Sequence, residues 1–445
     1  MTDNNGQRER TSGRTHRRQF LQVTGGAIAF GAVAGCVGDD DGGDDGTTDD
    51  GTTDDGDDSD DGNGGDDGTT TDDDMSGDPI TLGALQPLTG PFAAWGQAHS
   101  AGMDFAVQEI NDDGGVLGRE LTIQESDTGS DPGEADTIFR RMVEEENAVA
   151  VTGPVSSDVG IATRDTAEEL EVPVILHMAG SHRILPKDTR YCFRMGSHSA
   201  VTDMRSVLGM VEAEGFTEVG AIIADYEWGR SVETTIGELL PEDVNLTMEV
   251  TPLGTEDFAP ALRSFPEDVE VILASGHPPG SISIHNQAVE LGLNHEYAVG
   301  AGFPPGVLAG GLGENASSFA HQHVSDPYSD GFVDVAERFA EANGERFDTH
   351  EAYGYSAVQV YAEAMEAADS TDPTDVSDAM RENEFDVLLA NSIDYVEYGE
   401  VDNLVHMLST IQPEAPEYYP EGDWRLEELY RSDPLPAFDP DEWEF

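Results

Sequence analysis

Basic residues are scarce in this sequence, and lysine is almost missing. The chain carries 21 Lys and Arg against 91 Asp and Glu, for a formal net charge of −70, and Lys187 is its only lysine. Binding to nucleic acid by charge needs Lys and Arg side chains that displace counterions from the phosphates. The charge balance therefore excludes that class of function.

The acidic excess also indicates the medium in which the protein works. Residues 1–36 carry a formal net charge of +3 and residues 37–78 one of −19, so the residues from 79 onward carry a net charge of −54. Such self-repulsion is relieved in concentrated salt, where the Debye length falls to about 3 Å. We therefore expect a protein from an extreme halophile.

Cysteine and long apolar runs are also lacking. Cys36 and Cys192 are the only cysteines, and if Cys36 is modified no disulfide can form within the chain, so stability depends on the hydrophobic core. The apolar run at residues 23–35 is shorter than the roughly 20 residues that span a bilayer. It is therefore better interpreted as the core of an export signal than as a membrane anchor.

Two features flank this apolar run. Arg17 and Arg18 precede it, and it closes with Val-Ala-Gly before Cys36. Paired arginines are typical of twin-arginine export, and the closing sequence resembles a lipoprotein cleavage site. We predict that residues 1–36 are a twin-arginine lipoprotein signal, that Cys36 carries the lipid, and that the mature protein is anchored on the extracellular face of the cell membrane.

Residues 37–78 consist almost entirely of Asp, Gly and Thr, with 18 Asp between residues 39 and 74. Such a segment has too little apolar surface to offset its ordering entropy. We predict a disordered stalk that holds a globular body away from the membrane. A charge block can also be an interaction tail, but its position directly after Cys36 favours the stalk.

Strand and helix patterns alternate from residue 79 onward. The first series has strands near residues 80–85, 120–125, 148–151 and 172–176, and helices near residues 96–111, 134–146 and 156–170. The second series has strands near residues 219–224, 269–274 and 297–300. Its helices are one that ends near residue 215, one that starts near residue 229 and one that covers residues 281–291. This alternation predicts βαβ units on parallel sheets. Two series predict two doubly wound α/β lobes, in which ligands bind outside the carboxyl ends of the strands.

The last third returns to helical patterns near residues 331–343, 351–368 and 375–383, followed by a strand-like 393–397. We expect lobe 1 to comprise residues 79–198 plus about 325–390, and lobe 2 to comprise 199–324 plus about 391–445. Residues from 414 onward show neither the helical nor the strand pattern, and their Pro and aromatic residues suggest a segment that lies as a strap over the surface.

Motifs of catalysis are missing. The sequence has no Gly-x-Ser-x-Gly elbow, no His-Glu-x-x-His, no phosphate loop and no dinucleotide fingerprint. His321 and His323 could lie on one face of a strand, but without a third ligand nearby we expect surface histidines and no metal site. Ser181 and His182 lack an acid placed to orient the histidine. We expect neither an enzyme nor a cofactor.

Two sequence motifs instead resemble a known family. They are Ile80-Thr-Leu-Gly-Ala-Leu-Gln-Pro-Leu-Thr-Gly-Pro-Phe-Ala-Ala-Trp-Gly96 and Glu109-Ile-Asn-Asp-Asp-Gly-Gly-Val-Leu-Gly-Arg119. The first resembles the opening strand and loop of the leucine/isoleucine/valine-binding family of ABC-transporter receptors, and the second resembles its Ile-Asn-x-x-Gly-Gly-x-x-Gly turn. Asp127, Asp131-Pro132 and Gly153-Pro-Val-Ser-Ser157 follow in the family's order.

The resemblance covers roughly residues 79 to 410 and implies a type I periplasmic-binding-protein fold, whose two lobes close on a ligand. It implies an extracytoplasmic receptor that captures a branched-chain amino acid or a related small polar solute for an ABC permease and its ATPase. A tethered ligand sensor, or a receptor for amides or urea-like compounds, is the alternative.

By motif position, the resemblance implies that Ser157 and the loop Ala179-Gly180-Ser181 hold a ligand carboxylate. Ser157 also lies at an expected helix N-terminus, where free N–H groups and the helix dipole favour an anion; simple helix capping is the alternative. Trp95 and Trp228 take the family's aromatic places over an apolar ligand face, although each could be ordinary packing at a lobe edge.

One departure from the family pattern concerns the ligand's ammonium group. Members that bind α-amino acids place an acid where this chain has Gly302, and Gly276 replaces a common aromatic residue. A bound ammonium would need another carboxylate, such as Asp225 or Asp326. Amides, urea-like compounds and organic acids therefore stay open as ligands.

Overall fold

The computed structural model describes residues 75–445 apart from 197–198, 276–278, 302, 417–418, 420–423 and 443–445. All of them belong to the second of the two units into which the chain divides, Thr70–Phe445. The predicted signal with Arg17, Arg18 and Cys36, and the predicted stalk up to residue 74, lie outside the described residues. None of the helices in the described ranges has the length and apolar character needed to cross a membrane.

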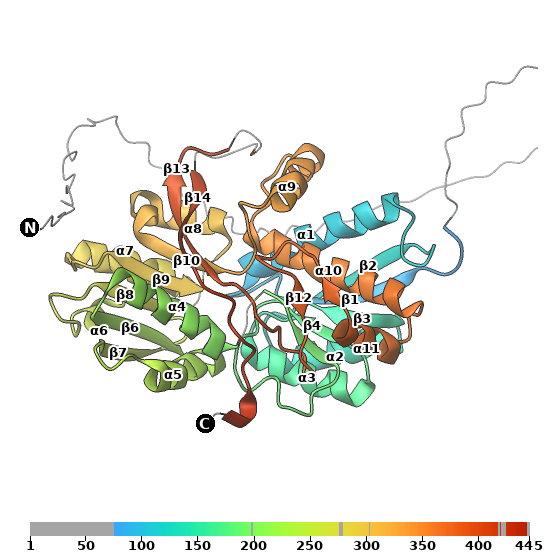
Figure 1. The fold of residues 1–445 in the computed structure, drawn as a ribbon, viewed down its shortest axis with the longest axis horizontal. Helices are drawn as coiled ribbons and strands as arrows, with labels where there is room; N and C mark the ends of the chain where they lie inside the picture. The colour runs from blue at the N-terminus through green and yellow to red at the C-terminus, as the bar shows by residue number, and fades with distance from the viewer. Residues whose placement is uncertain are drawn as a thin grey trace, which may run out of the picture. The chain divides into compact units, whose positions relative to one another are not determined.

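The first sheet is parallel throughout and has the strand order β2-β1-β3-β4-β5 (Figure 1). Its strands are β1 (Ile80–Gln86), β2 (Leu121–Asp127), β3 (Ala148–Thr152), β4 (Val174–Leu176) and β5 (Cys192–Arg194). The helices that connect its first four strands are α1 (Ala93–Asp112), α2 (Pro132–Glu144) and α3 (Ser157–Leu170).

The second sheet has the order β14-β13-β10-β9-β8-β6-β7. Its parallel part consists of β6 (Glu218–Asp225), β7 (Asn245–Pro252), β8 (Val271–Ser275), β9 (Tyr297–Ala301) and β10 (Phe319–His323), and β13 (Met407–Pro413) and β14 (Trp424–Arg431) add to it antiparallel. The helices of this lobe are α4 (Ala200–Glu214), α5 (Glu227–Leu239), α6 (Ala259–Leu262), α7 (Gly280–Leu291) and α8 (Pro305–Leu312), with a 3-10 turn at Gly313–Ser318.

Both sheets reverse their strand order after the first strand of the series. The chain passes from β1 to one neighbour, β2, and then to the other, β3, and it does the same at β6, β7 and β8. Loops that leave neighbouring strands in opposite directions open a crevice at the carboxyl ends of the strands. The predicted pair of doubly wound α/β lobes and the type I fold are confirmed.

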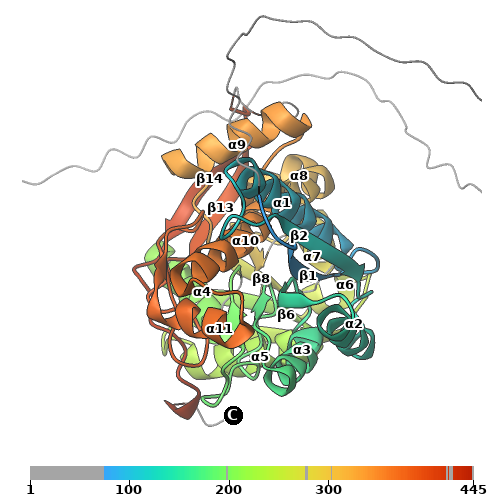
Figure 2. The same cartoon turned by 90° about the vertical axis from the view of Figure 1, so that its right-hand side faces the viewer.

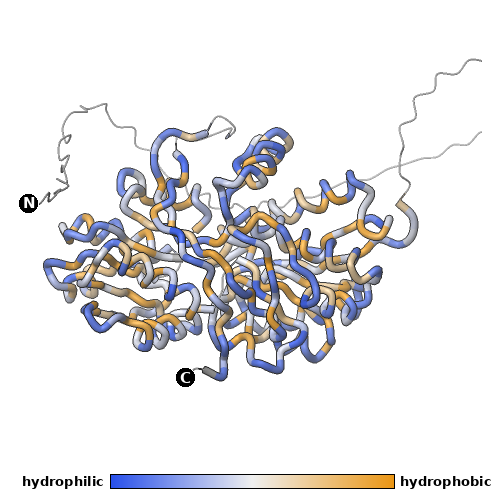
Figure 3. Tube along the Cα trace, viewed as in Figure 1, coloured by the Kyte–Doolittle hydropathy of each residue, from blue (hydrophilic) through white to orange (hydrophobic). Residues whose placement is uncertain are grey.

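Hydrophobic residues explain why these segments form strands. Every residue of β8, Val-Ile-Leu-Ala-Ser, is buried, as expected for a parallel strand covered by helices on both faces. Figure 3 shows hydrophobic residues gathered along the strands, whereas the outer turns and helix faces are hydrophilic.

Helix α4 has clear signals at both ends. The Ser199 hydroxyl accepts a hydrogen bond from the amide of Thr202 at the start of the helix, and Gly215 ends it with a φ of 74°.

A close helix pair completes lobe 1. Helix α10 (Thr349–Ala368) lies along α1 in both views (Figures 1 and 2). Gly102 of α1 faces the backbone oxygen of Glu351, and Gly354 of α10 faces that of His99, so tightly that a Cβ at either glycine would overlap the oxygen. Segments distant in sequence are thereby held in one lobe.

The return crossover lies later than residue 391. Helices α9 (Asp330–Asn343), α10 and α11 (Pro373–Glu382) pack with lobe 1, as expected, but Ile393, Tyr395, Val401 and Leu404 also belong to its hydrophobic cluster. We therefore place the crossover near residue 405. The expected strand at 393–397 is only β12 (Ile393–Asp394), paired with β11 (Glu384–Phe385).

Two further expectations were wrong. Residues after 414 are not only a strap, because β14 extends the lobe 2 sheet; Met407–Pro413 and Trp424–Arg431 pair as a hairpin. His321 and His323 lie on the buried strand β10 and are 0% and 2% exposed, so they are not surface histidines. Strands β13 and β14 mix polar and apolar residues without a regular alternation, and they were missed for that reason.

Candidate ligand-binding site

The predicted ligand residues follow the carboxyl ends of four strands. Trp95 lies in the first turn of α1, after β1; Ser157 begins α3, after β3; Ser181 follows β4; and Trp228 is in the first turn of α5, after β6. The first three belong to lobe 1 and Trp228 belongs to lobe 2. In doubly wound folds this edge of the sheet is where ligands bind.

Aromatic rings make contacts between the two lobes. Trp95 is 1% exposed and stacks on Phe303 of lobe 2, with ring centroids 4.6 Å apart and an interplanar angle of 13°. Phe92 contacts both Trp95, at 5.5 Å, and Tyr226, at 6.3 Å, and Tyr226 lies 6.5 Å from Trp228. All five rings belong to one buried cluster that includes the core of lobe 2.

Sequence reasoning missed three of these rings. Phe92 lies inside the motif that carried the family resemblance, and Tyr226 and Phe303 follow directly after β6 and β9. Their positions just beyond strand ends were the available signal, because that edge of a doubly wound sheet is where ligands bind.

Ser157 occupies the helix start that was predicted, but it does not cap its own helix. The N-cap of α3 is Ser156, which makes no side-chain capping bond. The Ser157 hydroxyl, 1% exposed, accepts the amide hydrogen of Ser181 at 3.1 Å. A serine that accepts one hydrogen bond can still donate its own hydrogen, so Ser157 links α3 to the loop at 179–181 and keeps a donor.

A buried arginine holds the loop at Ala179, Gly180 and Ser181. The guanidinium of Arg194, 0% exposed, donates to the carbonyl oxygens of Ala179 and of Ser181, the latter at 2.6 Å. The carbonyl oxygen of Gly180 accepts from the amide of Ala200 at 2.7 Å. All three carbonyl groups of the predicted ligand loop are therefore bonded within the protein.

The charge of Arg194 is balanced by a second buried group. Its Nε donates to Glu400 at 2.9 Å, and the two side chains are 0% and 1% exposed. Burial raises the pKa of Glu400, although Arg194 acts in the opposite direction. Sequence reasoning missed both residues, because the short strand β5 that carries Arg194 gave no periodic signal.

The same loop also contacts lobe 2 directly. The Ser181 hydroxyl donates to Glu227 at 2.8 Å, Arg183 pairs with Glu227 at 3.2 Å, and the amide of His182 donates to Ser231 at 3.1 Å. Glu227 is only 5% exposed. The hydroxyl that was predicted to hold a ligand is thus bonded to a carboxylate of the opposite lobe.

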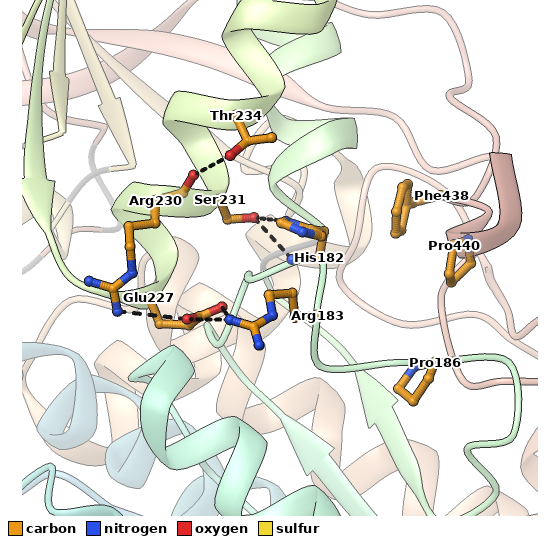
Figure 4. Close-up of a pocket in the computed structure, with 9 residues that line it drawn as sticks. All are labelled: His182, Arg183, Pro186, Glu227, Arg230, Ser231, Thr234, Phe438 and Pro440. Carbon is orange, nitrogen blue, oxygen red and sulfur yellow. Dashed lines mark hydrogen bonds and ion pairs between the residues drawn. The ribbon is translucent and has the colours of Figure 1, made fainter. Parts of the chain in front are cut away.

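An open pocket of 610 Å³ lies beside these contacts (Figure 4). Its residues come from the loop after β4, from α5 and from the C-terminal segment: His182, Arg183, Pro186, Glu227, Arg230, Ser231, Thr234, Phe438 and Pro440. Glu227 lies between Arg183 and Arg230, and burial, helped by nearby Arg183, lowers the pKa of His182 to about 4. Trp95, Ser157 and Trp228 are not among the residues that line this pocket.

The two acids suggested for a ligand ammonium are occupied elsewhere. Asp225 has a side chain 60% exposed and pairs with Arg230 at 3.0 Å, and Asp326 pairs with Arg431 at 3.0 Å. An exposed position argues against a role for Asp225 inside a ligand site.

The two glycines that depart from the family pattern, Gly276 and Gly302, lie outside the described residues. Within the described ranges, no group of three or more His, Cys, Asp or Glu is arranged to hold a metal ion.

Comparison with known proteins identifies the family. A model of the periplasmic binding protein family matches residues 79–405. The chain belongs to this family. The leucine/isoleucine/valine-binding resemblance of the two motifs is thereby confirmed, and β13, β14 and the C-terminal segment follow the matched region.

Curated members of the family cover most of this chain. The Leu/Ile/Val-binding protein homolog 1 of Brucella melitensis is 26% identical over 332 residues, which are 72% of this chain and 87% of that protein. A leucine-, isoleucine-, valine-, threonine- and alanine-binding protein of Pseudomonas aeruginosa is 25% identical over 344 residues, 74% of this chain and 89% of that protein.

Solved structures of periplasmic binding proteins share the fold. One from Burkholderia mallei has a TM-score of 0.71 at 16% identity and covers 82% of this chain and 97% of its own. A solute-binding protein of R. palustris in complex with benzoate has a TM-score of 0.69 at 19% identity. The match covers 81% of this chain and 98% of that protein. The branched-chain amino acid transporter substrate-binding protein of Streptococcus pneumoniae, in complex with isoleucine, has a TM-score of 0.66 at 20% identity. The match covers 79% of this chain and 99% of that protein.

Proposed function

We propose that this protein is the solute receptor of an ABC importer. It captures a branched-chain amino acid or a related small polar solute outside the cytoplasm and delivers it to the permease and its ATPase. Family membership and the names of the curated relatives support this proposal. The ligands named for the solved structures, isoleucine and benzoate, support a small carboxylate-bearing solute.

One observation carries the proposal furthest: Trp95 of lobe 1 stacks on Phe303 of lobe 2, within a buried cluster of rings that follow strand ends of both lobes. A receptor needs two lobes whose facing surfaces complete one site. Ligand contacts made only in the closed arrangement then stabilise it over the open one. Closure, and no chemical step, is the proposed mechanism.

We also propose where the receptor is held. The sequence features at Arg17, Arg18 and Cys36 support twin-arginine export and lipid anchoring, with residues 37–78 as a stalk. Cys36→Ser should release the folded protein into the medium, whereas Arg17→Lys with Arg18→Lys should retain it in the cytoplasm. Cell fractionation distinguishes these outcomes, and an unchanged membrane fraction for Cys36→Ser would contradict the anchor.

Thermal unfolding in molar KCl tests the receptor function with L-leucine, L-isoleucine, benzoate, acetamide and urea as probes. A ligand of the native state stabilises it by about 2.7 kcal/mol at a concentration 100-fold above Kd. A saturable rise in Tm with at least one probe supports the proposal. A flat response to all five, repeated by isothermal calorimetry, would count decisively against it.

A further inference from the structure

We propose that the segment after β14, residues 432–439, is a strap that crosses from lobe 2 back to lobe 1 and limits how far the lobes can open. The family model matches the chain only up to residue 405, so family membership does not account for this segment. In Figure 1 it is part of the dark red chain that leaves β14 and runs to the lower edge of the view. The inference concerns the regulation of the proposed receptor, and its effect on ligand binding rests on that function.

The strap begins at the edge of lobe 2. Ser432 exchanges two hydrogen bonds with His406, the residue before β13: its amide donates to the carbonyl oxygen of His406 at 2.9 Å, and its hydroxyl accepts from the amide of His406 at 2.9 Å. Arg205 of α4 donates to the carbonyl oxygen of Pro436 at 3.4 Å. The first residue of the strap is therefore fixed at the point where the chain enters the lobe 2 sheet.

The next residues of the strap are bonded to lobe 1 through their main chain. The amide of Leu435 donates to the carbonyl oxygen of Leu404 at 3.0 Å, and the amide of Ala437 donates to the carboxylate of Asp402 at 2.8 Å. The residue before each of these two donors is a proline, which has no amide hydrogen. Every amide donor of residues 434–437 is thus used on lobe 1, and Leu404 belongs to the hydrophobic cluster of that lobe.

The end of the strap is held by side chains of lobe 1. Phe438 is 2% exposed, and its carbonyl oxygen accepts the hydroxyl hydrogen of Tyr398 at 2.6 Å. Lys187, which lies between β4 and β5, pairs with Asp439 at 2.7 Å, and its ammonium nitrogen is 5.0 Å from the ring centroid of Tyr398. Because Lys187 is the only lysine of the chain, the single lysine side chain is used to hold the strap.

The strap also supports a direct contact between the lobes. The ring of Phe438 meets the ring of His182 edge to face, with centroids 6.1 Å apart. On its other side, the amide of His182 donates to the hydroxyl of Ser231 in α5 of lobe 2 at 3.1 Å, and the ring Nδ1 bonds the same hydroxyl. Figure 4 shows His182 between Ser231 and Phe438. Loss of the Phe438 ring would leave His182 without support on the side that faces away from lobe 2.

The two anchors of the strap are close together along the chain, and this closeness limits opening. Ser432 is held beside the lobe 2 sheet and Leu435 is held on lobe 1, and a stretch of three residues spans at most about 10–11 Å. A wider separation of the anchor points has to break the bonds of the strap to one of the lobes. The strap therefore favours arrangements near the closed one, and a larger closed fraction raises the apparent affinity for a ligand.

Distances between the lobes in the absence of ligand test the inference. Spin labels at Glu144→Cys in α2 and Glu238→Cys in α5, both exposed positions, report the separation of the lobes by double electron–electron resonance in molar KCl. The full chain is used with Cys36→Ser, so that it carries no lipid, and Cys192 is buried and does not take up a label. We expect a single narrow distribution of distances for the protein with an intact strap.

Two variants of the strap should broaden this distribution toward longer distances: Phe438→Ala and a chain that ends at Asp433. Phe339→Ala is the matched control, because Phe339 is also 2% exposed but packs within lobe 1 against Phe105 and Phe347. It should lower stability and leave the distances unchanged. Distances in Phe438→Ala that match those of the intact strap would overturn the inference, and so would equal broadening in both phenylalanine variants. If the shortened chain does not fold, Phe438→Ala decides alone.

Ligand binding separates this inference from the receptor function. With L-leucine or benzoate as the probe, Phe438→Ala should bind at least threefold more weakly by calorimetry in molar KCl, because its closed fraction is smaller. Broader distances together with an unchanged Kd would contradict the effect of the strap on binding. If neither probe binds the intact protein while Phe438→Ala still broadens the distances, the receptor function loses support and the strap stands.

Discussion

Trp95 of lobe 1 and Phe303 of lobe 2 stack with ring centroids 4.6 Å apart and an interplanar angle of 13°. Trp95 is 1% exposed, although it follows a loop at the edge of its own sheet. Phe92 and His350 of lobe 1 also contact this ring, so its burial depends in part on the opposite lobe. Because Phe303 covers one face of the ring, we expect lobe opening to expose that face of Trp95.

Replacing this ring should weaken ligand binding. Trp95→Ala removes the stack and a large buried apolar area from the closed state, so we expect a loss of affinity of at least tenfold. The measurement is Kd for the best ligand by calorimetry in molar KCl. Trp424→Ala is the control, since Trp424 lies on β14 and stacks on Arg346. Unchanged affinity in Trp95→Ala would contradict the site.

The close approach of α1 and α10 predicts a sharp contrast between two glycine substitutions. Gly102→Ala would place a Cβ on the backbone oxygen of Glu351, so we expect a loss of about 1–3 kcal/mol or more in the free energy of unfolding. Gly237, in helix α5, faces open space, so Gly237→Ala should stabilise by about 0.5–1 kcal/mol. Urea unfolding in molar KCl measures both, and similar effects from the two variants would refute the proposed packing.

The buried pair of Arg194 and Glu400 should be costly to break. Glu400→Ala leaves an uncompensated charge in the core of lobe 1, where the expected loss is about 3–5 kcal/mol in the free energy of unfolding. The pair of Arg425 and Glu427 is 40% and 52% exposed, so Glu427→Ala should cost less than about 1 kcal/mol. Urea unfolding compares the two variants; a loss below 1 kcal/mol for Glu400→Ala would show that Arg194 finds another partner.

Buried histidines predict a loss of stability in mild acid. Burial lowers the pKa of His177 and His406 to about 3 and that of His323 to about 4. Unfolded chains take up these protons near pH 6.5, so the histidines stabilise the fold fully above that pH. Their contribution falls as the pH drops from about 6.5 toward 4, by up to about 1.4 kcal/mol per pH unit for each histidine.

Buried acids oppose this trend, and Glu351 has the largest pKa shift among them. Burial raises the pKa of Glu351 to about 8, so its stabilising contribution is present below the unfolded value of about 4.5 and is lost as the pH rises through 8. Among the described residues, eight histidines have a lowered pKa and six acids have a raised pKa. The histidines outnumber the acids, so stability should rise with pH between 4.5 and 6.5. Urea unfolding at several pH values measures the slope, and His177→Gln with His406→Gln should flatten it. A slope of zero or of opposite sign in the unmodified protein would contradict the burial of neutral imidazoles.

The alternation of apolar strands and amphipathic helices was enough to predict both doubly wound lobes, because each βαβ unit is determined by local periodicity. Motif positions also predicted Trp95, Ser157 and Trp228 near strand ends. Periodicity could not find β5, which has three residues and no repeat, and so Arg194 was missed. It also placed the return crossover too early, since Ile393 and Leu404 carry no mark of the lobe that buries them.

By itself, the sequence determined the fold class, the family and the acidic surface of this protein. Those properties depend on local pattern, composition and short motifs. Only the tertiary structure decided how the ligand loop is bonded: Arg194 turns its carbonyl groups inward, and Glu227 crosses from the other lobe to Ser181. Such bonds join residues that are 13 to 46 positions apart in the chain, and hydrogen-bond partners at that separation are determined by packing.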